Sequence, residues 1–185
     1  MYETSMRTLL RFSAAIDRTN DRIGVAVRWL VLFMVIVGAF NALARYATGF
    51  TGISLSSNAL YDLQWYMFAL VFLLGAAYGL NKDVHVRVDV LYSRLSERGQ
   101  AWIDLVGSLV FLLPFCVMML WVSWPAVWNS WRSLEASLNP GGLPLYPIKT
   151  IILPAFFLLF LQGVSQAIKQ VECLRKTLDQ EAEKP

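Results

Sequence analysis

The residues that could hold a metal or a haem are few in this chain, and they do not cluster in its sequence. A membrane cytochrome needs several histidines as axial ligands, and His85 is the single histidine. Zinc needs grouped cysteines, histidines or carboxylates, whereas Cys116 lies in an apolar stretch and Cys173 in the polar tail. These two cysteines are expected at different depths of a membrane, where they cannot form a structural disulfide. We therefore expect no cofactor, no metal and no disulfide.

Signatures of covalent and phosphate chemistry are also missing from the sequence. It contains no nucleophile elbow, no phosphate-binding loop and no zinc-protease motif. No ionisable residue lies near the middle of an apolar stretch, where a proton or ion pathway would place one. The ionisable residues closest to these stretches lie near their ends: Asp62, Asp104, Arg28 and Arg45. The sequence therefore predicts neither an enzyme nor a stand-alone pump.

The composition of the chain predicts an all-α integral membrane protein. Of its 185 residues, 57% are hydrophobic and 16% are charged. Soluble domains have about 45 to 50% apolar and about 25% charged residues. The net charge of +3 comes from dispersed basic residues rather than from a basic patch interleaved with aromatic residues. We therefore expect membrane lipids with anionic headgroups as partners, and no nucleic acid.

Four apolar stretches of about 20 residues are long enough to cross a hydrocarbon core of about 30 Å. Pro114 and Pro125 predict kinks in the third of them or just beyond it. Before the first stretch, residues 1–23 are predicted as a helix on the cytoplasmic surface, and residues 169–185 are predicted as a polar cytoplasmic tail. The predicted transmembrane domain covers residues 24–168, with spans at 24–44, 59–80, 103–124 and 148–168.

Lysine and arginine residues predict the orientation of the spans, because they are in excess in cytoplasmic loops. They are frequent before the first span, between the second and third spans, and after the fourth. The two remaining loops hold only Arg45, Arg132 and Lys149. Both termini are therefore expected in the cytoplasm. The first span is expected to be an uncleaved signal anchor, since it is longer than the roughly 7 to 15 apolar residues of a signal peptide.

The segment before the first span has the pattern of an amphipathic helix. Four arginines fall within roughly 60° of one another on a helical wheel, with apolar residues on the opposite side. The arginines are Arg7, Arg11, Arg18 and Arg22, and the apolar residues are Leu9, Phe12, Ile16 and Ile23. This pattern predicts a helix that lies on the membrane surface. A helix docked on a partner protein is the alternative, and both arrangements could hold together.

Residues 84–95 fit two different periods. The run VHVRVDV alternates as a strand does, whereas Val84, Val88, Leu91 and Leu95 lie on one side of a helix. A single strand would have no pairing partner in this chain. We therefore predict a short amphipathic helix on the cytoplasmic surface, with Ser96 or Gly99 near the turn into the third span.

Small and polar residues in the spans are candidates for contacts with another subunit. Gly75 and Gly79 have the four-residue spacing that lets two membrane helices approach closely, and Gly38 repeats this spacing with Ala42. Arg45 could pair with Asp62 across the first two spans, or it could extend to the headgroups instead. A hydrogen bond from Gln162 to a neighbouring helix is also expected. The candidate partner-interface residues are Gly38, Asn41, Arg45, Asp62, Gly75, Gly79, His85, Arg87, Asp89 and Gln162.

Tryptophans continue along one side of the third span and past its end. Trp121, Trp124, Trp128 and Trp131 recur at spacings of three and four. Such a stripe is typical of anchoring at the membrane interface. Its extension beyond the span could also form a docking face for a periplasmic protein. The segment NPGGLPLYP at residues 139–147 is rich in turn-forming residues and should return the chain to the membrane.

Three motifs resemble the small membrane subunit of the tripartite ATP-independent periplasmic (TRAP) transporters. They are NALARY at Asn41 to Tyr46, FLLGAAYGL at Phe72 to Leu80 and HVRVDVLY at His85 to Tyr92. Four spans with both ends inside also match this family, and the resemblance covers nearly the whole chain. Relatives often have Glu where Asp62 stands here.

The resemblance implies a role rather than a reaction. In this family the small subunit is a fixed scaffold in the bacterial inner membrane, bound to a large subunit that carries sodium and substrate by an elevator-like motion. A periplasmic binding protein delivers the substrate, usually an organic acid. The candidate docking residues for that protein are Trp128, Trp131, Arg132 and Tyr146. The alternatives are a stand-alone four-span channel or accessory protein, and a membrane-bound enzyme or electron carrier.

Overall fold

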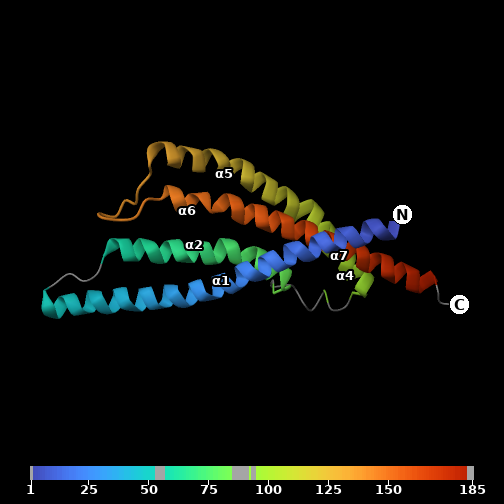
Figure 1. Ribbon diagram of the computed structural model, residues 1–185, viewed down its shortest axis with the longest axis horizontal. Helices are drawn as coiled ribbons and strands as arrows, with labels where there is room; N and C mark the ends of the chain where they lie inside the picture. The colour runs from blue at the N-terminus through green and yellow to red at the C-terminus, as the bar shows by residue number, and fades with distance from the viewer. Residues whose placement is uncertain (1, 53–56, 85–91, 93–94, 183–185) are drawn as a thin grey trace.

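The computed structural model describes residues 2–52, 57–84, 92 and 95–182. Within these residues, four helical segments are long and apolar enough to cross a membrane: Met6–Phe50, Asn58–Asn81, Glu97–Ser133 and Tyr146–Leu178. Figure 1 shows them running along one long axis, with both chain termini at the same end of the bundle. We call this the terminal end and the opposite one the loop end. The predicted all-α membrane protein with four spans is confirmed.

The first helix, α1 (Tyr2–Thr51), is continuous over 50 residues. At about 1.5 Å per residue it is about 75 Å long, more than twice the thickness of a hydrocarbon core. It joins the predicted surface helix and the predicted first span without a break, because it contains no proline. The helix ends at Gly52, where φ is +68°. The Gly52 N–H donates to the Thr48 carbonyl at 2.9 Å, which closes the last turn.

Helix α2 (Asn58–Asn81) runs antiparallel to α1 and packs along it through glycines. A methyl group added at Gly24 would lie 2.3 Å from the Tyr78 ring, and one added at Gly38 would lie 2.3 Å from Gln64 Nε2. Gly24 and Gly38 are as far apart in the sequence of α1 as Gln64 and Tyr78 are in that of α2. The α1–α2 contact is therefore a regular antiparallel pairing, in which glycine backbone meets a large side chain at each close approach.

The third segment consists of α4 (Glu97–Val106), the π-helical turn η1 (Gly107–Leu112) and α5 (Leu113–Ser133). Ser96 caps α4 by accepting a hydrogen bond from the Gly99 N–H. The wider turn lies directly before Pro114, which has no N–H to donate into a regular helix. The Leu113 N–H bonds instead to the Ser108 carbonyl. The irregularity expected at Pro114 is thus a π-helical turn.

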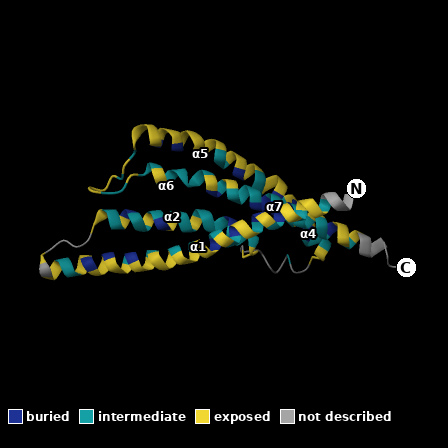
Figure 2. Ribbon diagram, viewed as in Figure 1, coloured by how far each residue is buried: buried dark blue, intermediate teal, exposed yellow. Residues whose placement is uncertain are grey.

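The fourth segment lies at the centre of the bundle. After the loop at residues 134–145, α6 (Tyr146–Thr150) leads into α7 (Ile152–Ala182). Helix α7 contacts α1, α2, α4 and α5. A small apolar core of Ala101, Leu105, Ala167 and Leu174 joins α4 to α7 at the terminal end. Figure 2 shows that the outer faces of α1 and α5 are largely exposed, as expected for helices that meet lipid or another membrane protein.

Candidate functional site

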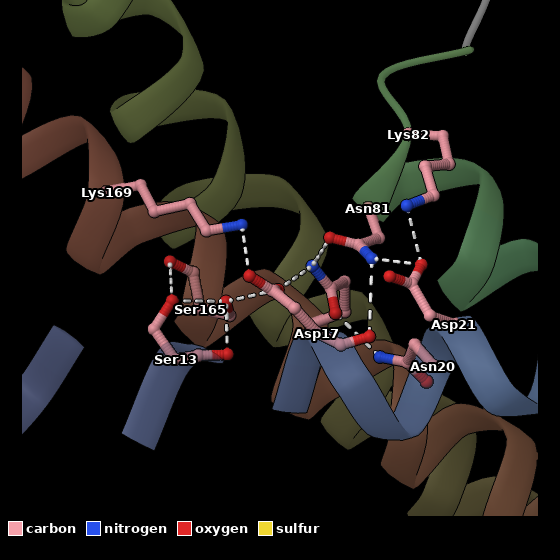
Figure 3. Close-up of polar contacts among 9 residues, drawn as sticks. Ser13, Asp17, Asn20, Asp21, Asn81, Lys82, Ser165 and Lys169 are labelled. Carbon is pink, nitrogen blue, oxygen red and sulfur yellow. Dashed lines mark hydrogen bonds and ion pairs between the residues drawn. The ribbon is translucent and has the colours of Figure 1, made fainter. Parts of the chain in front are cut away.

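Nine polar residues from three helices meet at the terminal end, and Figure 3 shows their contacts. We call them the terminal polar cluster. Its α1 members lie on one face of the helix, because they are spaced by three and four residues, and the same holds for its α7 members. The cluster comprises Ser13, Asp17, Asn20 and Asp21 of α1, Asn81 and Lys82 at the end of α2, and Gln162, Ser165 and Lys169 of α7.

Gln162 joins the three helices of this cluster and is fully buried. Its Nε2 donates to Asp17 Oδ1 at 3.0 Å and to Asn81 Oδ1 at 3.3 Å. Its Oε1 accepts from Asn20 Nδ2 at 2.6 Å. Both ends of one amide are thus used within the chain. The expected bond from Gln162 to a neighbouring helix forms inside this chain, and the buried side chain offers no surface to another subunit.

Two serines let α1 and α7 approach closely beside Gln162. The hydroxyl oxygens of Ser13 and Ser165 are 2.7 Å apart, and Ser165 Oγ also donates to Asp17 Oδ1 at 2.9 Å. Ser165 is fully buried and Ser13 is 1% exposed. Small polar side chains at such a contact combine close backbone approach with hydrogen bonds between helices.

The charges of the cluster are paired. Lys169 Nζ lies 2.7 Å from Asp17 Oδ2, and Lys82 Nζ lies 2.7 Å from Asp21 Oδ1. The hydrogen bond to Asp21 raises the pKa of the Lys82 ammonium above its ordinary value. Two cations therefore balance two carboxylates, and the cluster is electrically neutral. Such an arrangement holds helices together, and it leaves no free charge to act on a substrate.

A second polar site holds the loop at the loop end. Asp62 Oδ1 accepts from Asn139 Nδ2 at 2.8 Å, and its Oδ2 accepts from the Leu143 N–H at 3.0 Å. A methyl group added at Gly142 would lie 2.3 Å from Asp62 Oδ2, so this position needs glycine. The Tyr66 hydroxyl donates to the Pro144 carbonyl at 2.7 Å. We call these residues the loop clamp.

The candidate docking residues lie around the same loop. Trp131 Nε1 donates to Thr150 Oγ1 at 2.8 Å, and the Trp131 and Tyr146 rings are 4.6 Å apart. The Arg132 guanidinium lies 5.5 Å from the centre of the Trp128 ring. The structure therefore brings the four predicted residues together in two contacting pairs at the loop end.

An ion pair next to these residues closes the base of the loop. Lys149 bonds to Glu135, and the Leu145 N–H donates to the Glu135 carbonyl at 2.8 Å. The hydrogen bond from Lys149 lowers the pKa of the Glu135 carboxyl. The end of α5 and the start of α6 are thus joined by both backbone and side-chain contacts.

The other predicted site residues have diverse positions. Asp62 has the loop as its partner while Arg45 is exposed on α1, so the ion pair proposed between them gives way to the loop clamp. A methyl group at Gly75 would make an ordinary contact with Val27 at 3.9 Å. Asn41 is 5% exposed. The four arginines predicted at the membrane surface are exposed on α1: Arg7, Arg11, Arg18 and Arg22. At the end of α2, the Gly79 carbonyl accepts a hydrogen bond from the Val84 N–H. The remaining candidates, His85, Arg87 and Asp89, lie outside the described residues.

Most members of the terminal polar cluster escaped the sequence analysis. The amphipathic pattern of the N-terminal segment was defined by its arginines and apolar residues alone. Ser13, Asp17 and Asn20, which lie between these residues in the sequence, were left out of it. Their spacing was the available signal, since they share a face with Gly24. Across the described ranges, no group of three or more His, Cys, Asp or Glu side chains is placed to hold a metal ion.

Comparisons with known proteins agree on one family. The model of the family described as "Tripartite ATP-independent periplasmic transporters, DctQ component" matches residues 34–173. A protein of Haemophilus influenzae named "Putative TRAP transporter small permease protein" is 28% identical over 143 residues, which cover 75% of this chain and 77% of that protein. No solved structure matches the chain. The matched range includes α2, α4, α5 and α6, with most of α7 and the loop-end part of α1.

Proposed function

Because the chain belongs to the family of DctQ components of the tripartite ATP-independent periplasmic transporters, we propose that it is the small, non-catalytic scaffold subunit of a sodium-coupled transporter for organic acids. A large membrane subunit is its obligate partner and carries sodium and substrate. The chain described here supplies rigid packing surfaces to that subunit.

The observation that carries this proposal is the way Gln162 and the paired charges are used. Both ends of the Gln162 amide form hydrogen bonds with residues of α1 and α2. The two lysines of the terminal polar cluster form ion pairs with the two carboxylates of the cluster. A transport pathway needs polar groups that bind and release a solute. A fixed scaffold needs polar groups that bind each other, and this is the arrangement that the terminal polar cluster has.

The proposed location is the bacterial inner membrane, with the terminal end of the bundle in the cytoplasm. The exposed arginines of α1 then face anionic headgroups of the inner leaflet. The loop clamp then lies on the periplasmic side. Trp128 and Arg132 are exposed there on α5, and they form part of the surface that receives the substrate-binding protein.

The test is to express the chain with and without the large subunit of the transporter and to purify it in a mild detergent. We expect the two subunits to purify together, and sodium-driven uptake into liposomes to require both of them and the binding protein. If the chain instead purifies alone as a stable oligomer and conducts ions in liposomes, it is a channel and the scaffold proposal fails.

A further inference from the structure

A groove in the outer surface of α1 and α2 contains a polar side chain at membrane depth. The groove has a volume of about 480 Å³, and every residue that lines it belongs to α1 or α2. At about 1.5 Å per residue, Gln64 lies about 9 Å along the helix axis from Asn58, the first residue of α2. It therefore lies in the outer part of the second span, between Asp62 and Tyr66 in the sequence. The groove is lined by Met34, Val35, Gly38, Tyr61, Gln64, Trp65 and Phe68.

Gln64 has no hydrogen-bond partner for its amide among the residues that the structure describes. The amide lies against the backbone of α1, where Gly38 leaves room for it. Lipid tails offer neither donors nor acceptors, so an unpaired amide at this depth is costly. The side chain is only half-buried and can be reached from outside the chain.

A second unpaired amide lies next to the groove. Asn41 is three residues from Gly38 and therefore on the same side of α1. It is 5% exposed, and its Oδ1 is buried without a partner. Two amides without full hydrogen bonding thus occupy the loop-end half of the α1–α2 pair. At the terminal end Gln162 is fully satisfied, although Asn20 Oδ1 is buried there without a partner.

Aromatic rings form one wall of the groove and continue below it. The rings of Tyr61 and Trp65 are 6.3 Å apart, those of Trp65 and Phe68 are 6.4 Å apart, and those of Phe68 and Phe72 are 6.4 Å apart. All four side chains are exposed, from 44% at Tyr61 to 69% at Phe72. Exposed aromatic residues that support one another are typical of the central contacts in protein interfaces.

We infer that this groove receives a transmembrane helix of the large subunit, and that the helix presents a hydrogen-bonding side chain, such as Ser, Thr, Asn or Gln, to Gln64. The inference rests on the proposed function, and it adds which face of the chain meets the partner. The choice of a helix follows from the amide, because a lipid tail fills an apolar groove but cannot satisfy Gln64. The aromatic wall packs along the side of that helix.

The test is photocrosslinking in the complete complex. A photoreactive phenylalanine analogue replaces Phe68 in the groove or, as the control, Phe157 on α7, and both positions are 52% exposed. We expect the analogue at position 68 to crosslink to a transmembrane peptide of the large subunit, and the analogue at position 157 to leave that subunit unlinked.

Other outcomes overturn the inference in distinct ways. Crosslinks from position 68 to lipid alone, or to a second copy of this chain, assign the groove to another occupant. A crosslink from position 157 but not from position 68 moves the interface to α7. In these three cases the large subunit still purifies with the chain, so the proposed function stands. If the large subunit does not purify with it, the proposed function fails as well.

The Gln64→Leu variant tests the hydrogen bond itself. We expect the two subunits to associate about three- to thirty-fold more weakly, the range that one hydrogen bond between membrane helices supplies. Leucine keeps the bulk that packs against Gly38, so the melting temperature of the isolated chain should change little. Unchanged association overturns the role of the amide, and a fall in melting temperature as large as that of Gly24→Ala would show that Gln64 acts mainly inside the fold.

Discussion

Asn20 of α1 donates a hydrogen bond to Gln162 of α7 across 2.6 Å, although 142 positions of sequence separate the two residues. Both side chains are buried, Asn20 at 1% exposure and Gln162 at 0%. Because both side chains are shielded from water, solvent does not compete for this hydrogen bond, and it fixes the relative position of the two helices. It ties the first and last helices of the chain at the end where both termini lie.

The Gln162→Leu variant should destabilise the chain by at least about 2 kcal/mol. Leucine has a similar size, but it leaves the buried Asn20 Nδ2 without its partner, which costs about 1 to 3 kcal/mol. It also removes one of the two hydrogen bonds that Asp17 Oδ1 accepts, the other coming from Ser165 Oγ. Thermal unfolding of the purified chain in detergent measures the loss. Gln166→Leu is the matched control on the same helix, because Gln166 is half-buried and makes no hydrogen bond within the described residues. It should stay within about 0.5 kcal/mol, and equal effects of the two changes would contradict the assigned role of Gln162.

The Gly24→Ala variant should weaken the α1–α2 pairing by about 1 to 3 kcal/mol, as overpacking does elsewhere. The new methyl group would lie 2.3 Å from the Tyr78 ring, so the ring or the helix must move. Gly49→Ala provides the comparison, since nothing lies within 4 Å of a methyl group there. Alanine should raise stability by up to about 1 kcal/mol at that position, because it favours the helix. The same unfolding assay distinguishes the two, and a neutral result for Gly24→Ala would exclude the close approach.

The Asp62→Ala variant should release the loop at residues 134–145. It removes the acceptor of both the Asn139 side chain and the Leu143 N–H. We expect limited proteolysis to cut this loop at least several-fold faster while the spans remain protected. Asn58→Ala is a milder change, as it removes one bond to the Pro140 carbonyl at 3.0 Å. If proteolysis of the Asp62 variant proceeds at the original rate, the loop is held by other contacts.

Acid should loosen the base of the same loop through Glu135. The hydrogen bond from Lys149 lowers the pKa of this carboxyl from its ordinary value of 4.5. A lowered pKa in the folded state means that the stabilisation is complete above pH 4.5 and is lost as the pH falls through the lowered value. Proteolysis or tryptophan fluorescence near Trp131 should therefore change in that acidic window. The Glu135→Gln variant, which cannot ionise, should lose this pH dependence while keeping its loop backbone contacts.

The spans could be predicted from the sequence because length and hydropathy depend on no partner. The packing faces could not. Leu9, Phe12 and Ile16 are expected on the apolar face of the N-terminal segment; Ile16 is buried at 7% exposure, whereas Leu9 and Phe12 remain 44% and 51% exposed. The face that packs on α7 carries Ser13 and Asn20 instead, because buried amides and hydroxyls find partners there. Periodicity identifies an apolar side of a helix, but it does not show which polar residues have partners on another helix.

The loop clamp is another contact whose partners could not be predicted from the sequence. Asp62 lies near a span end, and the sequence leaves open whether Arg45 pairs with it or extends to the headgroups. The structure satisfies the carboxylate with an amide and a backbone N–H from a loop 77 and 81 positions away. Such partners carry no charge that a sequence could reveal. Only the turn residues of the loop, including Gly142, hint that it comes close to another element.

Because α1 is unbroken, it should move as one rigid rod about the point where the terminal polar cluster holds it. The terminal polar cluster grips it near Asp17, about 50 Å from its loop end and about 22 Å from its first residue, at about 1.5 Å per residue. A helix without proline does not bend sharply. Any tilt of its long arm within the membrane therefore swings the short arm, with Arg7 and Arg11, in the opposite direction by less than half the distance. The positions of Arg7 and Arg11 are thus coupled to the tilt of the loop-end part of the same helix.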